Sequence, residues 1–536
     1  MKYKTIKLSH TNEIIQTYGV NSLMAKVIES KKIDQKQFKS FMDPHLIYHD
    51  FSLFEEADET LERIEEAIAN KEKICIYGDY DCDGILATTI LVQAFHERGV
   101  EVGYHIPNRF TDGYGLNTTR VEQMAEKGYS LIITVDNGIK AFDAVEKAGE
   151  LGIDVIITDH HAFDGEVPVA YSIIHTKMSP KYPFKEICGG FIAYKLAAAL
   201  LKHHDPYLFT LASITTISDM MPLLDENRSL VRRGLQFMKQ YKYPSLELLK
   251  GSRDYNATTI GFTIAPRINA FGRLPELVNP VYLVKYFLKE ADPAYQEKIS
   301  NYASKINSKR QSLTTSLYKE AVTDTSSHCL FYGSENMHEG LVGLVAGKYT
   351  REYEQPAFVM HYNPKEEIYK GSARGIDGFN IYNFFTHHED LFVQYGGHAK
   401  AGGFTITKSN YPLVYDALMN DIKGCHFEAS ESVIPITLTD TTISNVESLD
   451  LLAPFGEENK APLFILEDVS CHQVDRLSEG KHLKFHLGDN QVSALAFNKG
   501  QLYDELVHKD SMTLVGTLSI NVLSLIHISE PTRLLS

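Results

Sequence analysis

The chain has 536 residues, of which 43% are apolar and 23% are charged, and its formal net charge is −16. This length predicts roughly two to four domains, and no stretch reaches the ~20 consecutive apolar residues of a membrane-spanning helix. The acidic balance argues against broad nonspecific nucleic-acid binding but is compatible with a local basic channel. The N-terminus has no apolar signal core, so we expect a cytoplasmic protein.

Strands and helices are predicted to alternate in the first half of the chain. Residues 1–50 are expected to form a small helical N-terminal segment that precedes a catalytic domain at 51–285. Within that domain, apolar strands are predicted at about 73–78, 101–106, 131–135, 153–158 and 171–175. Helical patterns such as 85–99 and 140–152 lie between them. This alternation predicts an α/β domain with a parallel sheet covered on both faces.

The second half of the chain changes in character. Residues 286–324 are expected to form a long connecting helix, followed by a second α/β unit at 325–425. Short alternating β segments at 426–520 then predict a small barrel. The last stretch, 521–536, does not continue the barrel pattern, and we expect an aberrant or foreign tail. Such a tail would leave the barrel incomplete with an open edge, a frayed C-terminus and a weakened grip on its ligand.

Cysteine spacing limits the metal chemistry that the chain can use. The six cysteines, at positions 75, 82, 188, 329, 425 and 471, form no C-x-x-C pair. A disulfide framework or a thiolate zinc site requires closely spaced or paired cysteines. We therefore expect scattered, reduced thiols.

Three aspartates, Asp79, Asp81 and Asp83, follow the first predicted strand in the stretch DYDCDG. The pattern resembles the start of a calcium-binding EF-hand loop, which requires a glutamate at its twelfth position. That position is Ile90, and a short apolar strand rather than an amphipathic helix precedes the loop. An EF-hand is therefore excluded, whereas a solvated turn remains an alternative for this stretch alone.

Acidic and histidine side chains also follow later elements. Asp136 follows a strand in VDNG, Asp159, His160 and His161 follow another in TDHH, and Asp219 ends the apolar stretch before MMPL. Alone, VDNG is typical of an Asx turn, and a His-His pair is typical of a surface or core pair. Because carboxyl ends of parallel strands meet at one edge of a sheet, we expect these side chains to share a crevice with the first three acids.

The side chains collected at this edge predict a metal site: Asp79, Asp81, Asp83, Asp136, His160, His161 and Asp219. Mixed oxygen and imidazole ligands suit manganese or magnesium better than zinc. Two such ions ~3.5–4 Å apart form the usual arrangement for phosphoester cleavage, in which they activate water and stabilise the leaving oxygen. A protein nucleophile is then unnecessary.

Four motifs, DYDCDG, VDNG, TDHH and SDMMPL, resemble in order and spacing those of the DHH phosphoesterase superfamily. Further blocks resemble the RecJ family of single-stranded-DNA-specific exonucleases, with its DHHA1 and OB-fold domains: 265–274, 340–359, 371–385, 395–406 and 451–464. The resemblance runs to about residue 520. It implies processive 5′→3′ removal of nucleotides from single-stranded DNA in recombination and repair.

The resemblance also implies roles for individual residues. Two ions, Mn²⁺ preferred or Mg²⁺, would be held by Asp79, Asp81, Asp83, Asp136, His160 and Asp219. Asp136 is the expected bridging ligand, and His161 is expected to face the scissile phosphate. Asp159 is expected to orient a histidine without itself binding a metal ion. The expected catalytic group consists of Asp136, Asp159, His160 and His161.

Arginines in the later motifs are expected to bind the DNA backbone. Arg267 and Arg273 flank Asn269 in what we predict to be a loop bounded by proline and glycine, suited to bidentate phosphate contacts. The alternative is that either arginine braces Asp219 or its neighbours. Ser372 and Arg374 lie among small residues that would let a phosphodiester approach closely.

His398 lies in the glycine-rich stretch GGHAKAGG, which we expect to form a loop offering backbone N–H groups to phosphate, although a tight structural turn explains it equally well. A hole between the two α/β lobes, roofed by the long helix, is expected to admit one strand and exclude a duplex. The barrel would add a second grip on DNA. By resemblance, a RecQ-type helicase and single-strand-binding protein are expected partners of a monomer.

Two other functions compete with this interpretation. The first is a pyrophosphatase, or a phosphodiesterase for short oligonucleotides or cyclic dinucleotides, built on the same metal core. Such enzymes lack the OB-like segment and the PRINAFGR block. The second is a catalytically inactive scaffold of a replication assembly, but such relatives have lost metal ligands that this chain retains.

Overall fold

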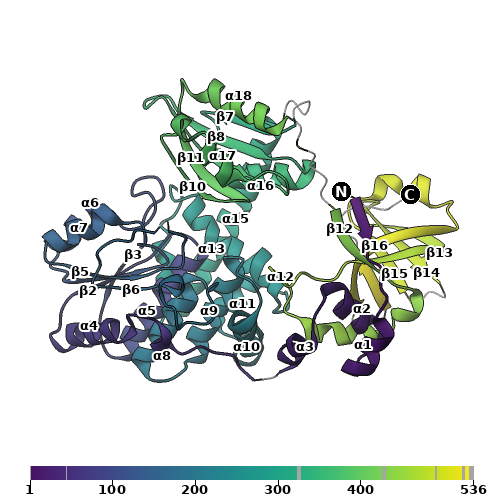
Figure 1. Ribbon diagram of the computed structural model, residues 1–536, viewed down its shortest axis with the longest axis horizontal. Coiled ribbons are helices and arrows are strands. Elements are labelled where there is room, and N and C mark those ends of the chain that lie inside the picture. The colour runs from purple at the N-terminus through teal and green to yellow at the C-terminus, as the bar shows by residue number, and fades with distance from the viewer. Residues whose placement is uncertain are drawn as a thin grey trace. The chain divides into compact units, whose positions relative to one another are not determined.

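The computed structural model describes residues 2–43, 45–163, 165–322, 328–423, 425, 430–488, 492–521 and 525–529 (Figure 1). The chain divides into two compact units. Leu46–Phe427 form the larger unit, and Met1–His45 together with Glu428–Ser536 form the smaller one.

A five-stranded parallel sheet organises the first domain of the larger unit, with the strand order β3-β2-β4-β5-β6. Its strands are β2 (Ile74–Tyr77), β3 (Gly103–His105), β4 (Leu131–Val135), β5 (Asp154–Thr158) and β6 (Ser172–Ile174). Each observed strand lies inside the range predicted for it, and all but β3, whose sequence is GYH, are mainly apolar runs bounded by polar or turn residues.

Alternate residues of these strands enter two separate cores. In β2, Ile74 and Ile76 belong to one hydrophobic cluster, whereas Cys75 and Tyr77 belong to another. The first cluster is covered by α4 (Ala57–Ala69), α5 (Cys82–Glu97) and α8 (Gly189–Leu201). The second is covered by α6 (Thr118–Glu126) and α7 (Phe142–Glu150), on the other side of the sheet in Figure 1. The predicted two-sided cover is confirmed.

Helices complete this domain and lead to the next. They are α9 (Pro206–Ser218), α10 (Asp225–Tyr241), α11 (Pro244–Lys250), α12 (Ala257–Thr259), the π-helical turn η3 (Ile260–Ile264), α13 (Ala265–Arg273), α14 (Val281–Phe287) and α15 (Pro293–Ala321). The last of these is the predicted connecting helix. Asp292 caps its N-terminus by accepting a hydrogen bond from Tyr295 N, and Pro293 occupies the first turn, where no backbone donor is needed.

The second domain of the larger unit has a mixed sheet, with the order β10-β11-β9-β8-β7. Its elements are β7 (Leu330–Ser334), α16 (Val342–Tyr353), β8 (Ala357–Asn363), β9 (Ile368–Arg374), α17 (Ile381–His387), β10 (Gln394–His398), β11 (Ala401–Thr407) and α18 (Tyr411–Ile422). The prediction of a second α/β unit is confirmed.

The smaller unit contains a barrel. Its strands are β12 (Ser430–Pro435), β13 (Phe464–Leu477), β14 (His482–Leu487), β15 (Val492–Ala496), β16 (Ser511–Asn521) and β17 (Leu525–Ser529), with the short helices α19 (Ile443–Ser448) and α20 (Tyr503–Leu506). Strands pair in the cyclic order β13-β14-β15-β17-β16-β13, so the ring of hydrogen bonds closes. A barrel was predicted from the alternating segments, and the pairing confirms it.

Strand β17 occupies the barrel edge that was expected to be open. This strand pairs in parallel with β15 and antiparallel with β16, so it fills the edge that the sequence pattern left open. Residues 522–524 and 530–536 lie outside the described part of the chain. A foreign origin for 521–536 stays a prediction.

The N-terminal segment belongs to the same unit as the barrel. It forms β1 (Lys2–Thr5), α1 (Thr11–Tyr18), α2 (Ser22–Lys31) and α3 (Gln35–Met42). Strand β1 pairs in parallel with β12, and buried residues of α2 such as Leu23 and Val27 share a core with Phe464 and Phe485. The predicted helices are present, but this partner was not predicted.

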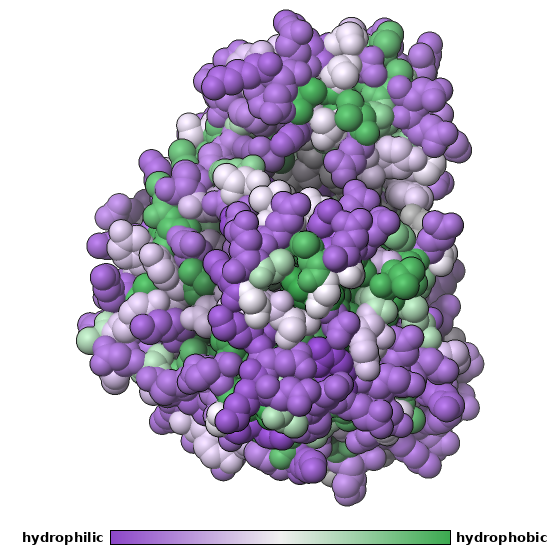
Figure 2. Space-filling model, turned by 90° about the vertical axis from the view of Figure 1, so that its left-hand side faces the viewer, coloured by the Kyte–Doolittle hydropathy of each residue, from purple (hydrophilic) through white to green (hydrophobic). Residues whose placement is uncertain are grey.

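The surface shown in Figure 2 is mainly hydrophilic, and its hydrophobic residues form small, separate patches. Among the described residues, no helix has the length and apolar character needed to cross a membrane.

Candidate metal centre and nucleic-acid interface

The first acidic motif forms a tight turn between β2 and α5. Asp79 and Asp83 are almost fully buried, and Asp81 caps α5 by accepting a hydrogen bond from Gly84 N at 3.1 Å. A Cβ atom on Gly84 would lie 2.5 Å from the backbone nitrogen of Asp79, closer than real Cβ contacts. Glycine at 84 therefore lets the turn fold back and hold the acids in place.

Asp83 is held by the N-terminus of α8. Gly189 N and Gly190 N donate hydrogen bonds to its two carboxylate oxygens, each at 2.8 Å. Backbone N–H groups and the positive end of the helix dipole stabilise the carboxylate there. A Cβ on Gly190 would lie 2.8 Å from Asp83 Oδ1, so close approach of the backbone requires glycine.

Asp136 adopts a strained backbone conformation directly after β4. Its φ is +63°, a left-handed value that costs on the order of 1–3 kcal/mol for a residue other than glycine. It is 2% exposed, and its backbone N–H donates to Thr158 O at 3.0 Å. Strain of this kind at the carboxyl edge of a sheet is typical of functional residues.

Asp159 organises the two histidines that follow β5. One of its carboxylate oxygens accepts hydrogen bonds from His160 N at 2.7 Å and from His161 Nδ1 at 2.7 Å. The other accepts from Ile139 N at 3.0 Å. Asp159 therefore fixes the ring of His161 through the hydrogen bond from Nδ1.

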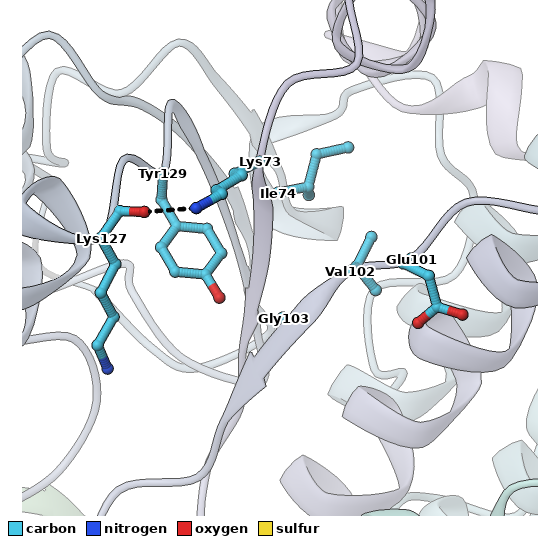
Figure 3. Close-up of a pocket in the computed structure, with 7 residues that line it drawn as sticks. All are labelled: Lys73, Ile74, Glu101, Val102, Gly103, Lys127 and Tyr129. Atoms are coloured by element: carbon cyan, nitrogen blue, oxygen red, sulfur yellow. Dashed lines mark hydrogen bonds between the residues drawn. The ribbon is translucent and has the colours of Figure 1, made fainter.

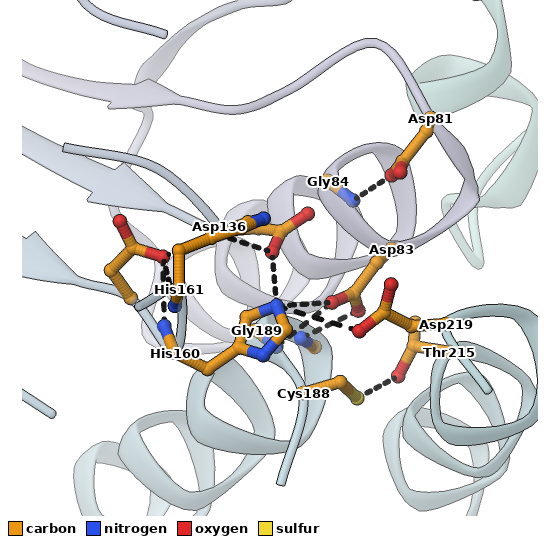
Figure 4. Close-up of polar contacts among 12 residues, drawn as sticks. Asp81, Asp83, Gly84, Asp136, His160, His161, Cys188, Gly189, Thr215 and Asp219 are labelled. Atoms are coloured by element: carbon orange, nitrogen blue, oxygen red, sulfur yellow. Dashed lines mark hydrogen bonds and ion pairs between the residues drawn. The ribbon is translucent and has the colours of Figure 1, made fainter. Parts of the chain in front are cut away.

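The remaining acids converge on His160 (Figure 4). Its Nε2 lies 3.1 Å from Asp136 Oδ1, 3.5 Å from Asp219 Oδ2 and 3.9 Å from Asp83 Oδ2. Asp219 comes from the C-terminal end of α9. Asp79 and Asp81 form a second group with Asp136, with ligand atoms within 4.8 Å of one another. The structure thus brings together all seven side chains that the sequence predicted to share a crevice.

These side chains fit divalent cations. Within the described part of the chain, four buried atoms of this cluster have no hydrogen-bond partner: Asp79 Oδ1, Asp136 Oδ1, His160 Nε2 and Asp219 Oδ2. Buried polar atoms are otherwise almost always paired, so this group calls for a ligand. Carboxylates with a neutral imidazole form a donor set that suits manganese and magnesium.

The electrostatics of the cluster support the same interpretation. Burial and the charge of Asp81 raise the pKa of Asp79 to about 8 and that of Asp83 to about 6. Burial and neighbouring aspartates raise the pKa of Asp136 well above its usual value, and burial lowers the pKa of His160 to about 3. The crowded carboxylates therefore lack positive charge, which bound cations would supply.

Comparison with known proteins places this site in a family. Three family models match the chain: the DHH family N-terminal domain at residues 73–217, the DHHA1 domain at 326–424 and the RecJ OB domain at 434–524. A protein of Salmonella typhimurium named single-stranded-DNA-specific exonuclease RecJ is 30% identical, over 82% of this chain and 83% of the relative. The chain belongs to the RecJ family.

Other RecJ proteins are similar over different shares of their length. The RecJ of Bacillus subtilis is 34% identical over 86% of this chain. The crystal structure of RecJ in complex with Mn²⁺ from Thermus thermophilus superposes with a TM-score of 0.84, at 26% identity, covering 100% of this chain and 79% of that chain. The chain spans 61% of the B. subtilis relative and 65% of the T. thermophilus relative matched by sequence.

Four arginines lie close together in the larger unit. Burial and the charges of Arg109, Arg310 and Arg374 lower the pKa of Arg273 to about 9. Arg273 ends α13 and donates to Gly340 O at 3.3 Å, and Arg374 Nη1 donates to Ser372 Oγ at 2.6 Å. Burial and Arg374 also lower the pKa of His398, which places that ring near the cluster.

This arginine cluster (Arg109, Arg273, Arg310 and Arg374) forms no ion pair within the described part of the chain. Buried guanidinium groups that repel one another and form no ion pair are costly unless an anion joins them. The arrangement suits a phosphate group. Of the residues predicted to bind DNA, Arg273, Ser372, Arg374 and His398 lie in or beside this cluster.

Of the two loops predicted around these residues, the first is wrong, and the second is replaced by the tight structural turn that was its alternative. The PRINAFGR segment is the helix α13, in which Pro266 occupies the first turn. The stretch GGHAKAGG lies in the hairpin of β10 and β11, where its glycines pair in the strand ladder. Proline and glycine suggested loops, but proline is tolerated in a first helical turn and glycine in a close strand pair.

Arg267 and Asn269 make contacts that differ from those expected. Arg267 donates a hydrogen bond to Leu249 O, and Asn269 Oδ1 accepts one from Cys82 N at 2.7 Å. Among the described residues, neither Arg267 nor Arg273 forms an ion pair with Asp219, so the part of the bracing alternative that concerns Asp219 is not observed. Asn269 instead supports the turn that carries the first three acids.

Three residues beside the metal centre or in the arginine cluster were not predicted from the sequence. Arg109 follows β3, and its guanidinium carbon lies 4.4 Å from the centroid of the Tyr80 ring. Tyr114 donates to Asp136 O at 3.1 Å and contacts the ring of His161. The rule that ligands bind beyond carboxyl ends of strands would have indicated the loop after β3. Arg310 lies in a long polar helix whose pattern gave no such signal.

A separate cavity of about 560 Å³ lies at the other edge of the parallel sheet (Figure 3). It is lined by Lys73, Ile74, Glu101, Val102, Gly103, Lys127 and Tyr129. These residues lie near the amino ends of β2 and β3, and none of the predicted site residues is among them.

Proposed function

We propose that this chain is a 5′→3′ exonuclease that degrades single-stranded DNA to mononucleotides by hydrolysing phosphodiester bonds. The observation that carries the proposal is the buried cluster of carboxylates and His160, whose unpartnered atoms lie in the same unit as the arginine cluster. Membership of the RecJ family supports DNA as the substrate, since relatives are named single-stranded-DNA-specific exonucleases.

Two divalent ions, Mn²⁺ preferred or Mg²⁺, would be held by Asp79, Asp81, Asp83, Asp136, His160 and Asp219. Asp136 is the proposed bridging ligand, because it belongs to one group of potential ligand atoms with Asp79 and Asp81 and to another with His160. When bound, the ions would lower the pKa of a water molecule and neutralise charge on the phosphate oxygens.

The side chains of the protein would position the phosphate and hold a proton next to it. The His161 side chain is 42% exposed, whereas that of His160 is 10% exposed. Although burial opposes it, the hydrogen bond and charge of Asp159 raise the pKa of His161 to about 9. Asp159 would therefore hold the ring of His161 so that its other ring nitrogen can donate a hydrogen bond to the scissile phosphate.

The arginine cluster would bind the phosphate at the 5′ side of the strand, with Ser372 and His398 as further donors. Asn269 would keep the acidic turn in place through Cys82 N, and Arg267 would contact the strand further from the centre. Fixed donors hold one phosphodiester in a single orientation. Hydrolysis is then more probable at that bond than at random positions along the strand.

An end-labelled degradation assay with Mn²⁺ tests this function. We expect immediate release of a labelled mononucleotide from 5′-labelled single strands and none from a blunt duplex, and loss of this activity by at least ~10³-fold in Asp136→Ala. Asp143→Ala, an exposed acid on α7, is the matched control and should leave the rate unchanged. Release from the 3′ end, equal attack on duplex, or full activity of Asp136→Ala would contradict the proposal. Hydrolysis of dinucleotides alone would favour the competing phosphodiesterase.

We also propose a cytoplasmic monomer that works with a RecQ-type helicase and single-strand-binding protein. Only the family resemblance supports these partners. Co-purification with single-strand-binding protein and the mass of the chain in solution would test them.

A further inference from the structure

Phe262 presents an aromatic ring to solvent in the π-helical turn η3. The residue is 81% exposed, and Met220, next to the potential metal ligand Asp219, is 69% exposed. Single exposed apolar residues are ordinary on protein surfaces, so the position of this ring matters more than its exposure. Single π turns inside α-helices also occur frequently at functional sites.

The π turn packs on the turn that carries Asp219. A Cβ on Gly261 would lie 3.6 Å from Cγ2 of Ile217, in the last turn of α9. Asp219 caps the end of that helix, and Met220 follows it with φ +55°. The segment that exposes Phe262 thus touches the segment that brings Asp219 to the acidic cluster.

The helical segment that carries Phe262 continues to residues of the catalytic centre. The elements α12, η3 and α13 follow one another without a break, and α13 contains Asn269 and Arg273. Asn269 supports Cys82 in the acidic turn, and Arg273 belongs to the arginine cluster. At 1.5 Å per residue, Phe262 lies roughly 10 Å along the axis from Asn269.

Two arginines belong to or lie near the same helical segment. Arg267 follows Phe262 by five residues, in α13, and burial together with the charge of Arg253 lowers the pKa of its guanidinium, so the two arginines are near each other. Neither forms an ion pair among the described residues. An aromatic ring beside groups that attract phosphate is the usual arrangement for binding single-stranded nucleic acid.

We infer that Phe262 stacks on an unpaired base of the strand that leads into the catalytic centre. This inference rests on the proposed exonuclease function and adds a residue that holds the strand. In a duplex both faces of each base are already stacked on neighbouring bases, so a ring at this position would accept only single strands. Phe262 would then contribute to strand selection before hydrolysis.

The absence of tryptophan from the chain provides a direct test. Phe262→Trp introduces a single indole, and its emission should be quenched as oligothymidylate binds in EDTA, where no hydrolysis occurs. Tyr171→Trp is the matched control: Tyr171 is 48% exposed, but it lies at the amino end of β6, on the other edge of the sheet. Its emission should not change.

Affinity supplies the second measurement. Phe262→Ala should weaken binding of labelled single strands about tenfold, whereas Phe262→Tyr should bind like the wild type, because a stacked base contributes on the order of a tenfold change or more. Circular dichroism checks that each variant is folded. We expect folded variants because Phe262 is exposed.

The outcomes separate the inference from the proposed function. If the wild-type protein degrades single strands while Phe262→Trp binds DNA with unchanged emission, the stacking inference is wrong and the exonuclease function stands. Equal quenching in Tyr171→Trp would also overturn it, since the signal would not be local. If the wild-type protein neither binds nor degrades single strands, both fail together.

Discussion

At the scale of single residues, the acidic cluster depends on glycines as much as on its acids. Gly84 lets the turn of the first motif fold back on Asp79, and Gly189 and Gly190 bring two N–H groups to Asp83. The acids were predictable because they follow strands that end at one edge of a parallel sheet. The glycines of α8 were not, because the contact joins residues about a hundred positions apart and leaves no local pattern.

Gly189→Ala tests this dependence. The new Cβ would lie 2.5 Å from Asp136 Cβ and 2.7 Å from its Oδ1, so Asp136 must move. We expect the free energy of unfolding to fall by about 1–3 kcal/mol, as for other overpacked sites, and Mn²⁺ affinity to fall with it. Denaturant titration and calorimetric titration with Mn²⁺ measure the two effects.

The matched control is Gly149→Ala in α7, where a Cβ meets no atom within 4 Å. That change should raise the free energy of unfolding by up to about 1 kcal/mol, because alanine favours the helix, and should leave Mn²⁺ affinity unaltered. Wild-type stability and metal affinity in Gly189→Ala would contradict the role assigned to the glycine.

At the scale of elements, α13 shows where sequence patterns mislead. Proline and glycine in PRINAFGR favoured a loop, yet the segment is helical, with Pro266 in the first turn and Gly272 packed on the carbonyl of Tyr80. A Cβ on Gly272 would lie 2.0 Å from that oxygen. Glycine is thus present for a close approach between helix and acidic turn, a tertiary contact that outweighs its low helix propensity.

Asn269→Ala should loosen the acidic turn without removing any potential ligand. The substitution deletes the acceptor of the Cys82 N–H bond and leaves that donor unpaired, so Asp81 and Asp83 lose a support. Groups that orient ligands typically contribute ~10–100-fold to metal affinity, and we expect a loss of that size in Mn²⁺ binding. Binding of single strands in EDTA should change less.

Asn279→Ala serves as its control, since the side chain of Asn279 accepts a hydrogen bond from Val281 N, near the start of α14 and outside the acidic turn. Equal losses of Mn²⁺ affinity in the two variants would show that the effect is general instability. A large loss of strand affinity with normal Mn²⁺ affinity in Asn269→Ala would instead support the direct contact between Asn269 and DNA that was predicted from the sequence.

At the scale of the whole molecule, the N-terminal segment packs with the barrel at the other end of the sequence and not with the domain that follows it in the chain. The parallel sheet, the connecting helix, the second α/β domain and the barrel were all predictable, because each is built from consecutive segments with a clear period. The partner of the N-terminal segment was not, because Asp440 lies more than four hundred residues from the Lys26 and Ser22 side chains that bind it. Local periodicity carries no information on such a contact.

Leu23→Ala tests the assignment of the N-terminal segment to the barrel unit. Leu23 is fully buried in the core that α2 shares with the barrel, so its truncation should cost about 2–5 kcal/mol of stability. Hydrogen exchange should show the loss in β14, whose Leu483 and Phe485 belong to that core, and not in α5. Leu208→Ala, equally buried in α9, should give the reverse pattern, since its core includes Ile90 and Leu91 of α5. If Leu23→Ala instead lowered protection of α5 and left β14 unchanged, the N-terminal segment would belong with the catalytic domain that follows it in sequence.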